Sequence, residues 1–205
     1  SRETDVMPNI GFLSKQGVWR KTKKRVSESI EGHVQEIIRL YEKKKGAYRE
    51  PLKFGGSLES AFIKEFQYID TPDQRTAWED IKGDFEKEQP MYRLLCGDVG
   101  FGKTEIAMRM AFRVVLNGGR VVVLVPTSIL AVQHYKVFCD RMKNFGVNVS
   151  VLTGFLSAKE KSSLKMSWLE GKQDVLISTS AALYDADFIR VASAFIVDEE
   201  HRFGV

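Results

Sequence analysis

The sequence has 205 residues, 43% of them hydrophobic and 28% charged, with a formal net charge of +4. Such a chain can build its own core, and its longest purely apolar run, Val121–Val125, is far shorter than the ~18 residues of a membrane span. No secretion signal marks the N-terminus, and two cysteines, Cys96 and Cys139, are too few for a disulfide framework or a zinc site. We therefore expect a cytoplasmic protein without a membrane segment, in which both cysteines are buried as small apolar side chains.

The positive charge is concentrated near the N-terminus, where residues 1–50 contain 12 Lys and Arg but only 7 Asp and Glu. The densest run, Arg20–Arg25, is either a solvated helix face or a patch that contacts phosphates. Apolar residues recur at helical spacing over residues 15–45, which predicts a long amphipathic helix that ends at Gly46. We expect residues 1–50 to form a helical extension from an upstream module and residues 51–205 to form the main domain.

The main domain is predicted to begin with a helix near Leu58–Phe66 and a second helix over residues 72–85, with Thr71 as its N-cap and Pro72 in its first turn. From there, apolar runs typical of buried strands alternate with helical patterns. The expected strands are Arg93–Cys96, Val121–Val125, Val147–Leu152, Val175–Ser178 and Ala194–Val197. The expected helices are Thr104–Leu116, Ser128–Met142, Ser157–Leu169 and a segment around Ala181–Ile189. This alternation predicts an α/β fold in which helices cover both faces of a parallel sheet.

One segment matches a phosphate-binding loop. The pattern G-x-x-x-x-G-K-[ST], between a predicted strand and a predicted helix, is satisfied by Gly97, Asp98, Val99, Gly100, Phe101, Gly102, Lys103 and Thr104. In such a loop, backbone N–H groups and the dipole of the following helix hold phosphate oxygens. Lys103 would reach the β- and γ-phosphates and Thr104 would ligate Mg²⁺, so we expect ATP and Mg²⁺ to bind here.

A pair of carboxylates follows the last predicted strand. Asp198 and Glu199 stand at the carboxyl end of Ala194–Val197, which is the end at which open α/β sheets bind ligands. Acidic residues after a strand often only cap its end, but here they follow a phosphate loop by ~95 residues within one domain. We therefore predict that Asp198 holds Mg²⁺ and that Glu199 orients or deprotonates the attacking water.

Two residues upstream of the loop allow two interpretations each. Gln74, three residues after Thr71, either closes a capping box or reads the edge of an adenine ring with its amide. Phe66 is either part of the core or a ring that stacks on adenine. Composition alone favours the capping interpretation of Gln74, because a capping box needs no ligand.

Together these motifs resemble the first motor lobe of superfamily 2 DNA translocases, and most closely the bacterial family of transcription-repair coupling factors. The resemblance rests on "TPDQ", "GDVGFGKTE", "VPTSILAVQH" and "VDEEHRFGV". It extends upstream into a segment similar to the helices that join that family's polymerase-binding module to its motor. The related RecG family usually has Ser in place of Phe101 and Gln in place of Glu200, which favours the coupling factors.

The resemblance implies a RecA-like lobe with Lys103, Asp198 and Glu199 in catalysis and with adenine contacts at Gln74 and Phe66. It also implies contacts with the DNA backbone, and the matching positions are Pro126, Thr127, Thr153, Gly154 and Thr179. Hydroxyl groups at helix N-termini suit phosphate binding without base reading, although the same residues are also ordinary helix caps. Ser178 and Ser180 depart from the family, which commonly has Gly and His there.

The function implied is that of an ATP-dependent translocase on double-stranded DNA, which displaces stalled RNA polymerase and couples transcription to repair. RNA polymerase and nucleotide-excision-repair proteins would bind through parts that this sequence does not contain. Since no second motor lobe follows the "DEEH" motif, we expect the fragment alone to be nearly inactive as an ATP hydrolase. Two alternatives remain, which are a RecG-like fork-remodelling helicase lobe and a non-catalytic module that binds a protein partner.

Overall fold

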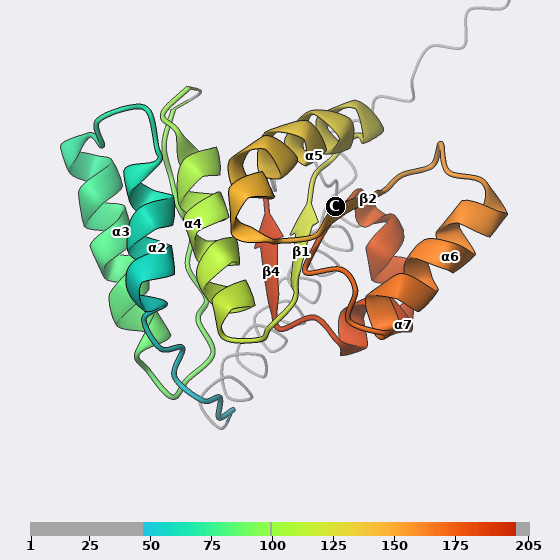
Figure 1. Ribbon diagram of the computed structural model, residues 1–205, viewed down its shortest axis with the longest axis horizontal. Helices are drawn as coiled ribbons and strands as arrows, with labels where there is room; N and C mark the ends of the chain where they lie inside the picture. The colour runs from blue at the N-terminus through green and yellow to red at the C-terminus, as the bar shows by residue number, and fades with distance from the viewer. Residues whose placement is uncertain (1–46, 99, 200–205) are drawn as a thin grey trace, which may run out of the picture. The chain divides into compact units, whose positions relative to one another are not determined.

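The computed structural model describes residues 47–98 and 100–199 (Figure 1). The chain divides into two compact units, Ser1–Arg49 and Glu50–Val205, and nearly all described residues belong to the second. The predicted N-terminal helix and the basic run Arg20–Arg25 lie outside the described residues, as do Val99 and Glu200.

A four-stranded parallel sheet forms the centre of the second unit, with the strand order β2-β3-β1-β4. The strands are β1 (Val121–Leu124), β2 (Val149–Leu152), β3 (Val175–Ser178) and β4 (Ala194–Val197). Val121 of β1 lies opposite Val175 of β3 and Ala194 of β4, so the strands begin and end at common edges. The predicted parallel sheet is confirmed, and β3 and β4 have the bounds that the sequence predicted.

The helices follow the predicted alternation closely. They are α2 (Gly56–Lys64), α3 (Pro72–Phe85), α4 (Lys103–Leu116), α5 (Ser128–Met142), α6 (Ala158–Leu169) and α7 (Ala186–Arg190), with 3₁₀ turns η1 (Lys143–Phe145) and η2 (Ser180–Tyr184). Capping boxes at Thr71 and Ser157 start α3 and α6, because each N-cap hydroxyl accepts from a backbone N–H three residues on. Within residues 47–98 and 100–199, no helix has both the length and the apolar composition that crossing a bilayer demands.

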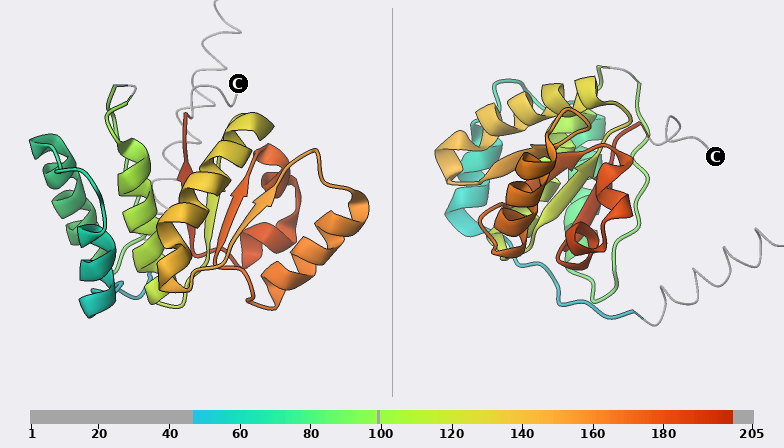
Figure 2. Two further views of the ribbon diagram at one scale, coloured as in Figure 1. Left: turned by 45° about the horizontal axis from the view of Figure 1, so that its top comes forward. Right: turned by 90° about the vertical axis from the view of Figure 1, so that its right-hand side faces the viewer.

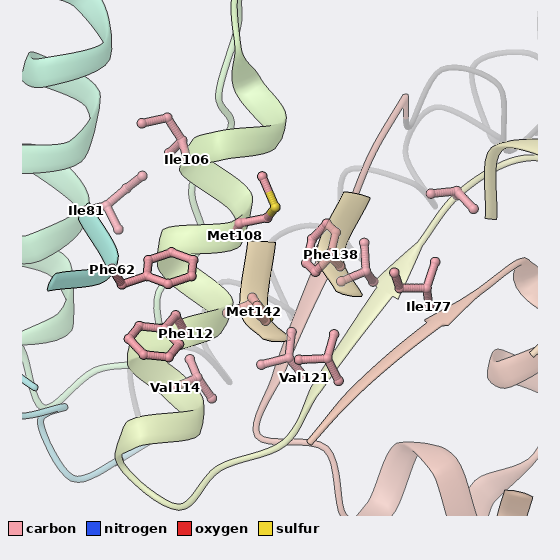
Figure 3. Packing of buried hydrophobic residues seen from close by; sticks show 14 of the residues in the cluster. Phe62, Ile81, Ile106, Met108, Phe112, Val114, Val121, Phe138, Met142 and Ile177 are labelled. Atoms are coloured by element: carbon pink, nitrogen blue, oxygen red, sulfur yellow. The ribbon is translucent and has the colours of Figure 1, made fainter. Parts of the chain in front are cut away.

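Helices cover both faces of the sheet, as predicted (Figures 1 and 2). Alternate residues of β1 point to opposite faces, so Val121 and Val123 pack with α4 and α5 while Val122 and Leu124 pack with α6, η2 and α7. On the first face, α2 and α3 extend the layer outward, and the rings of Phe62 and Phe112 stack 4.2 Å apart between α2 and α4 (Figure 3). The two faces hold two separate hydrophobic clusters.

One predicted strand does not form. Arg93–Cys96 has no regular secondary structure and does not join the sheet, and Arg93 instead donates a hydrogen bond to Asp84 at the end of α3, with 2.6 Å between Nε and Oδ2. An apolar run favours an extended backbone, but pairing depends on neighbours that are distant in the sequence. Cys96 is consequently exposed and Cys139 is half-buried, so the expectation of two buried cysteines is wrong.

The strands also differ in burial. β1 and β3 are buried at every position, as expected for strands covered on both faces. In the outer strands β2 and β4, buried or half-buried residues alternate with more accessible ones, and Phe195 and Val197 are 41% and 45% exposed. A continuous apolar run therefore overestimates the burial of β4, because Ala194 and Ile196 pack against the core on one face of the sheet while Phe195 and Val197 point to the opposite face and stay partly exposed.

Buried ion pairs connect α4 to the neighbouring helices α2 and α5. Arg113 of α4 bonds to Glu59 of α2, and both side chains are at most 2% exposed. Two turns nearer the phosphate loop, Glu105 accepts hydrogen bonds from Arg109 at 2.9 Å and from Arg141 of α5 at 3.0 Å. The helix that follows the phosphate loop is thereby held against both α2 and α5.

Candidate nucleotide and DNA site

The carboxyl edge of the sheet gathers most of the predicted site residues. Because all four strands are parallel, the segments that follow them emerge at the same edge. These segments contain Pro126 and Thr127 after β1, Thr153 and Gly154 after β2, Thr179 after β3, and Asp198 and Glu199 after β4. The fold thus places the candidate DNA contacts and the carboxylate pair along one edge.

The phosphate loop turns sharply into α4. Gly100 and Gly102 have φ angles of +83° and +77°, a left-handed conformation that glycine adopts without steric cost. Lys103 is the first residue of α4, and its ammonium donates to the carbonyl oxygens of Gly97 at 2.6 Å and Asp98 at 2.8 Å. The loop therefore wraps around the Lys103 ammonium, at the helix terminus where anions are favoured.

Gly102→Ala is expected to destabilise the chain by about 1–2 kcal/mol, because the left-handed backbone disfavours alanine. The new Cβ would also lie 2.3 Å from Nε2 of Gln74, which must then move away from the loop. Urea denaturation measures the change. Gly83→Ala in α3 is the matched control: nothing lies within 4 Å of the added Cβ, and we expect stabilisation by roughly 0.5–1 kcal/mol. A loss of stability at Gly83 as large as that at Gly102 would contradict this explanation.

Gln74 joins α3 to the phosphate loop. Its backbone N–H donates to Oγ1 of Thr71 at 3.2 Å, and its Oε1 accepts from the Thr71 N–H at 2.9 Å, so the capping interpretation is confirmed. Its Nε2 also donates to the carbonyl oxygen of Phe101 at 2.7 Å. A cavity of about 60 Å³ beside this bond is lined in part by Gln74, Phe101 and Lys103. The adenine contact of Gln74 stays a prediction.

Phe66 is half-buried, before the N-terminus of α3. Its ring meets Tyr68 edge to face, with 5.5 Å between centroids, and the Arg109 guanidinium lies 5.2 Å from its centroid. Arg109 is itself held by Asp70 through two bonds of 2.8 Å. Phe66 is therefore anchored to α4 at the rim of the core, and adenine stacking on its ring stays a prediction.

The hydroxyl residues after the strands mostly act as helix caps. Oγ1 of Thr127 accepts from the N–H of Leu130 at 3.2 Å at the start of α5, and Thr179 similarly caps η2. Thr153 is only 3% exposed, whereas the neighbouring Gly154 is exposed. The capping interpretation is thus confirmed for Thr127 and Thr179, and DNA contact at this edge stays a prediction.

Asp198 has a partner that we did not predict from the sequence. Nε2 of His134 in α5 lies 2.8 Å from Oδ2 of Asp198. This hydrogen bond, with a smaller effect from the positive charge of Lys103, holds the pKa of Asp198 below its usual value, although burial acts in the opposite direction. His134 belongs to the motif "VPTSILAVQH", and its spacing from the buried Ala131 and Phe138 is the signal that places it on the inner face of α5.

Glu199 follows Asp198 in an unusual backbone conformation. Its φ angle is +53°, in the left-handed region that residues other than glycine rarely adopt. Such conformations cost of the order of 1–3 kcal/mol and often occur at functional sites. The chain therefore turns sharply directly after β4, at the residue predicted to act on water.

The residues present fit a magnesium nucleotide. Mg²⁺ prefers oxygen ligands and is usually held by one or two carboxylates together with substrate phosphates. Asp198, with its lowered pKa, offers a carboxylate rather than a carboxylic acid, and Thr104 adds a hydroxyl in the first turn of α4. The conformation of Gly102 and its contact with Gln74 leave room for backbone only, as a phosphate cradle requires.

Comparisons with known proteins agree with this geometry. The family model described as DEAD/DEAH box helicase matches residues 71–205. The transcription-repair-coupling factor of Staphylococcus haemolyticus (strain JCSC1435) is 42% identical over 187 residues, and that of Staphylococcus aureus (strain USA300) is 41% identical over 189 residues. Each alignment covers 91% of this chain but only 16% of the relative, so the chain spans about a sixth of these proteins.

A solved structure shows the same fold. It is described as the structure of RecG bound to a three-way DNA junction, and it matches with a TM-score of 0.73 and 35% identity over 81% of this chain and 23% of the other. The identity to the coupling factors is higher, so the likeness expected from the motifs is confirmed. The family model covers well over half of the chain and includes the loop, the carboxylate pair and Gln74. The chain therefore belongs to the DEAD/DEAH box helicase family.

Proposed function

We propose that this chain is the ATP-binding first motor lobe of a double-stranded DNA translocase that displaces stalled RNA polymerase and couples transcription to DNA repair. The observation that carries the proposal is the placement of Lys103 at the start of α4 and of Asp198 directly after β4, a strand against which α4 packs. A phosphate-binding lysine beside an ionised carboxylate is the arrangement that phosphoryl transfer from a magnesium nucleotide requires. The sequence identity of 42% to a transcription-repair-coupling factor supports a translocase of that kind.

In this proposal each residue of the site has a defined role. The loop N–H groups and Lys103 bind the β- and γ-phosphates, while Thr104 and Asp198 hold Mg²⁺, which would neutralise charge on the transferred phosphoryl group. Glu199 orients the attacking water and accepts its proton. Gln74 faces the adenine. The segments after the strands contact the DNA backbone without reading bases.

The rest of the activity depends on parts that the coupling factors have beyond the matched region. A second motor lobe would supply the arginine that stabilises the transition state, and further modules would bind RNA polymerase and excision-repair proteins. Such a protein works in the bacterial cytoplasm, where DNA and polymerase are. Since an arginine finger contributes about 10³–10⁵-fold in rate, we expect the 205-residue chain alone to bind ATP but to hydrolyse it very slowly.

Thermal unfolding with magnesium nucleotide tests the proposal. Mg-ATP or Mg-ADP at 100 times its dissociation constant is expected to stabilise the chain by ~2.7 kcal/mol, which corresponds to a rise in Tm of about 5–11 °C. Lys103→Ala is expected to fold normally and show no shift. If the unsubstituted chain shows no shift at millimolar nucleotide, the proposal fails and a non-catalytic partner-binding module is favoured. DNA-stimulated turnover by the chain alone would contradict the need for a second lobe.

A second candidate, a fork-remodelling helicase lobe, is favoured by the likeness to RecG on a three-way DNA junction. The complete protein separates the two functions. ATP-dependent release of a stalled RNA polymerase from linear DNA supports the coupling-factor assignment. Regression of a model replication fork without polymerase release supports the RecG-like assignment.

A further inference from the structure

We infer that His134 is the positioning residue of the metal site: it holds one oxygen of Asp198 so that the carboxylate is already oriented to ligate Mg²⁺. This inference rests on the proposed function and gives a role to a residue whose sequence motif implies none. The observation behind it is the bond between Nε2 of His134 and Oδ2 of Asp198, with 2.8 Å between the two atoms.

The position of His134 is set by helical periodicity. The buried stripe of α5 consists of Ala131, Phe138 and Met142. His134 falls on the same stripe, because it lies three residues after Ala131 and four residues before Phe138. Its ring is nearly parallel to that of Phe138, with an interplanar angle of 20° and 6.4 Å between centroids. The imidazole is therefore held between the helix and the carboxyl edge of the sheet, with its side chain 15% exposed.

Asp198 is fixed at two points. Its backbone N–H donates to the carbonyl oxygen of Leu124 at 2.9 Å, which extends the pairing of β1 and β4 by one residue. The hydrogen bond to His134 then fixes the orientation of the carboxylate, since the χ2 torsion of an aspartate otherwise adopts a broad range of values. With Oδ2 on His134, the carboxylate can present Oδ1 to a metal ion without first losing rotational freedom.

Metal affinity is the property that this role predicts. Hydrogen-bond partners that orient metal ligands typically change metal affinity by 10–100-fold when they are removed. We therefore expect His134→Ala to weaken Mn²⁺ binding to the ADP-bound chain by about 10–100-fold, measured by electron paramagnetic resonance. Binding of a fluorescent ADP analogue in EDTA should stay within about twofold of the unsubstituted chain, because the loop and Lys103 are untouched.

Two further variants separate positioning from packing. His134→Gln places an amide N–H near Nε2 and is expected to restore most of the metal affinity, whereas His134→Phe keeps a ring beside Phe138 and should lose affinity like alanine. Gln133→Ala, at an exposed neighbouring position of α5, is the matched control and should bind Mn²⁺ normally. Thermal unfolding checks that each variant is folded.

The outcomes are distinguishable from failure of the proposed function. If the unsubstituted chain binds neither ADP nor Mn²⁺, the proposed function itself fails. If it binds both and the folded His134→Ala and His134→Phe variants bind Mn²⁺ as tightly, only the positioning role is overturned. Equal losses of ADP affinity with and without metal would likewise overturn it, because they would indicate a general disturbance of the site.

Discussion

Glu199→Gln is expected to lower the rate of ATP hydrolysis by the complete form of the proposed translocase by about 10²–10⁴-fold, the usual contribution of a general base. Glutamine has nearly the same size but cannot accept a proton from water. Glu199 stands directly after Asp198, and its left-handed backbone turns the chain at the carboxyl end of β4. Single-turnover hydrolysis at saturating Mg-ATP measures the chemical step and separates it from product release.

Nucleotide binding should survive this substitution, because in the proposed site the loop binds the phosphates and Asp198 holds the metal ion. We expect the dissociation constant of Mg-ADP for Glu199→Gln to stay within about threefold of the unsubstituted protein, a difference below 1 kcal/mol. Lys103→Ala should lose binding and hydrolysis together, and Glu88→Gln, at an exposed site, should lose neither. A single-turnover rate for Glu199→Gln close to that of the unsubstituted protein would exclude Glu199 as the base.

Arg113→Met is expected to destabilise the chain by about 3–5 kcal/mol, because it leaves the Glu59 carboxylate buried without its counter-charge. Both side chains are at most 2% exposed, and the guanidinium also lies 5.4 Å from the ring centroid of Trp78 and 5.3 Å from that of Phe85. Urea denaturation, followed by circular dichroism, measures the free energy of unfolding.

Two comparisons make this result specific to the buried pair. The double variant Glu59→Met/Arg113→Met removes both charges and should be markedly more stable than Arg113→Met alone. Arg190→Met alters an exposed arginine whose Nη2 lies 3.9 Å from Oδ1 of Asp187, and it should change stability by less than about 0.5 kcal/mol. If Arg113→Met costs no more than Arg190→Met, the buried pair is not a stabilising feature of this fold.

Most of the fold was predictable because its signals are local. The capping boxes at Thr71 and Ser157 depend on side chains only three residues apart, and α5 and β3 begin and end where the patterns predicted. The prediction of a strand at Arg93–Cys96 was wrong, because an apolar run indicates an extended backbone but does not identify a partner strand. The burial of β4 was overestimated for a related reason, since the partial exposure of Phe195 and Val197 on one face of the sheet is a property of the tertiary packing.

The candidate site was likewise predictable only in part from the sequence. The pattern of residues 97–104 and the pair Asp198–Glu199 predicted a nucleotide site and indicated the family that the family model confirms, because that chemistry demands particular residue types at short spacing. Which polar groups meet was decided by the tertiary structure alone. His134 and Asp198 are 64 residues apart, Gln74 and Phe101 are 27 apart, and Glu59 and Arg113 are 54 apart. Such contacts follow from the order of the strands and the packing of helices on them, which no local pattern contains.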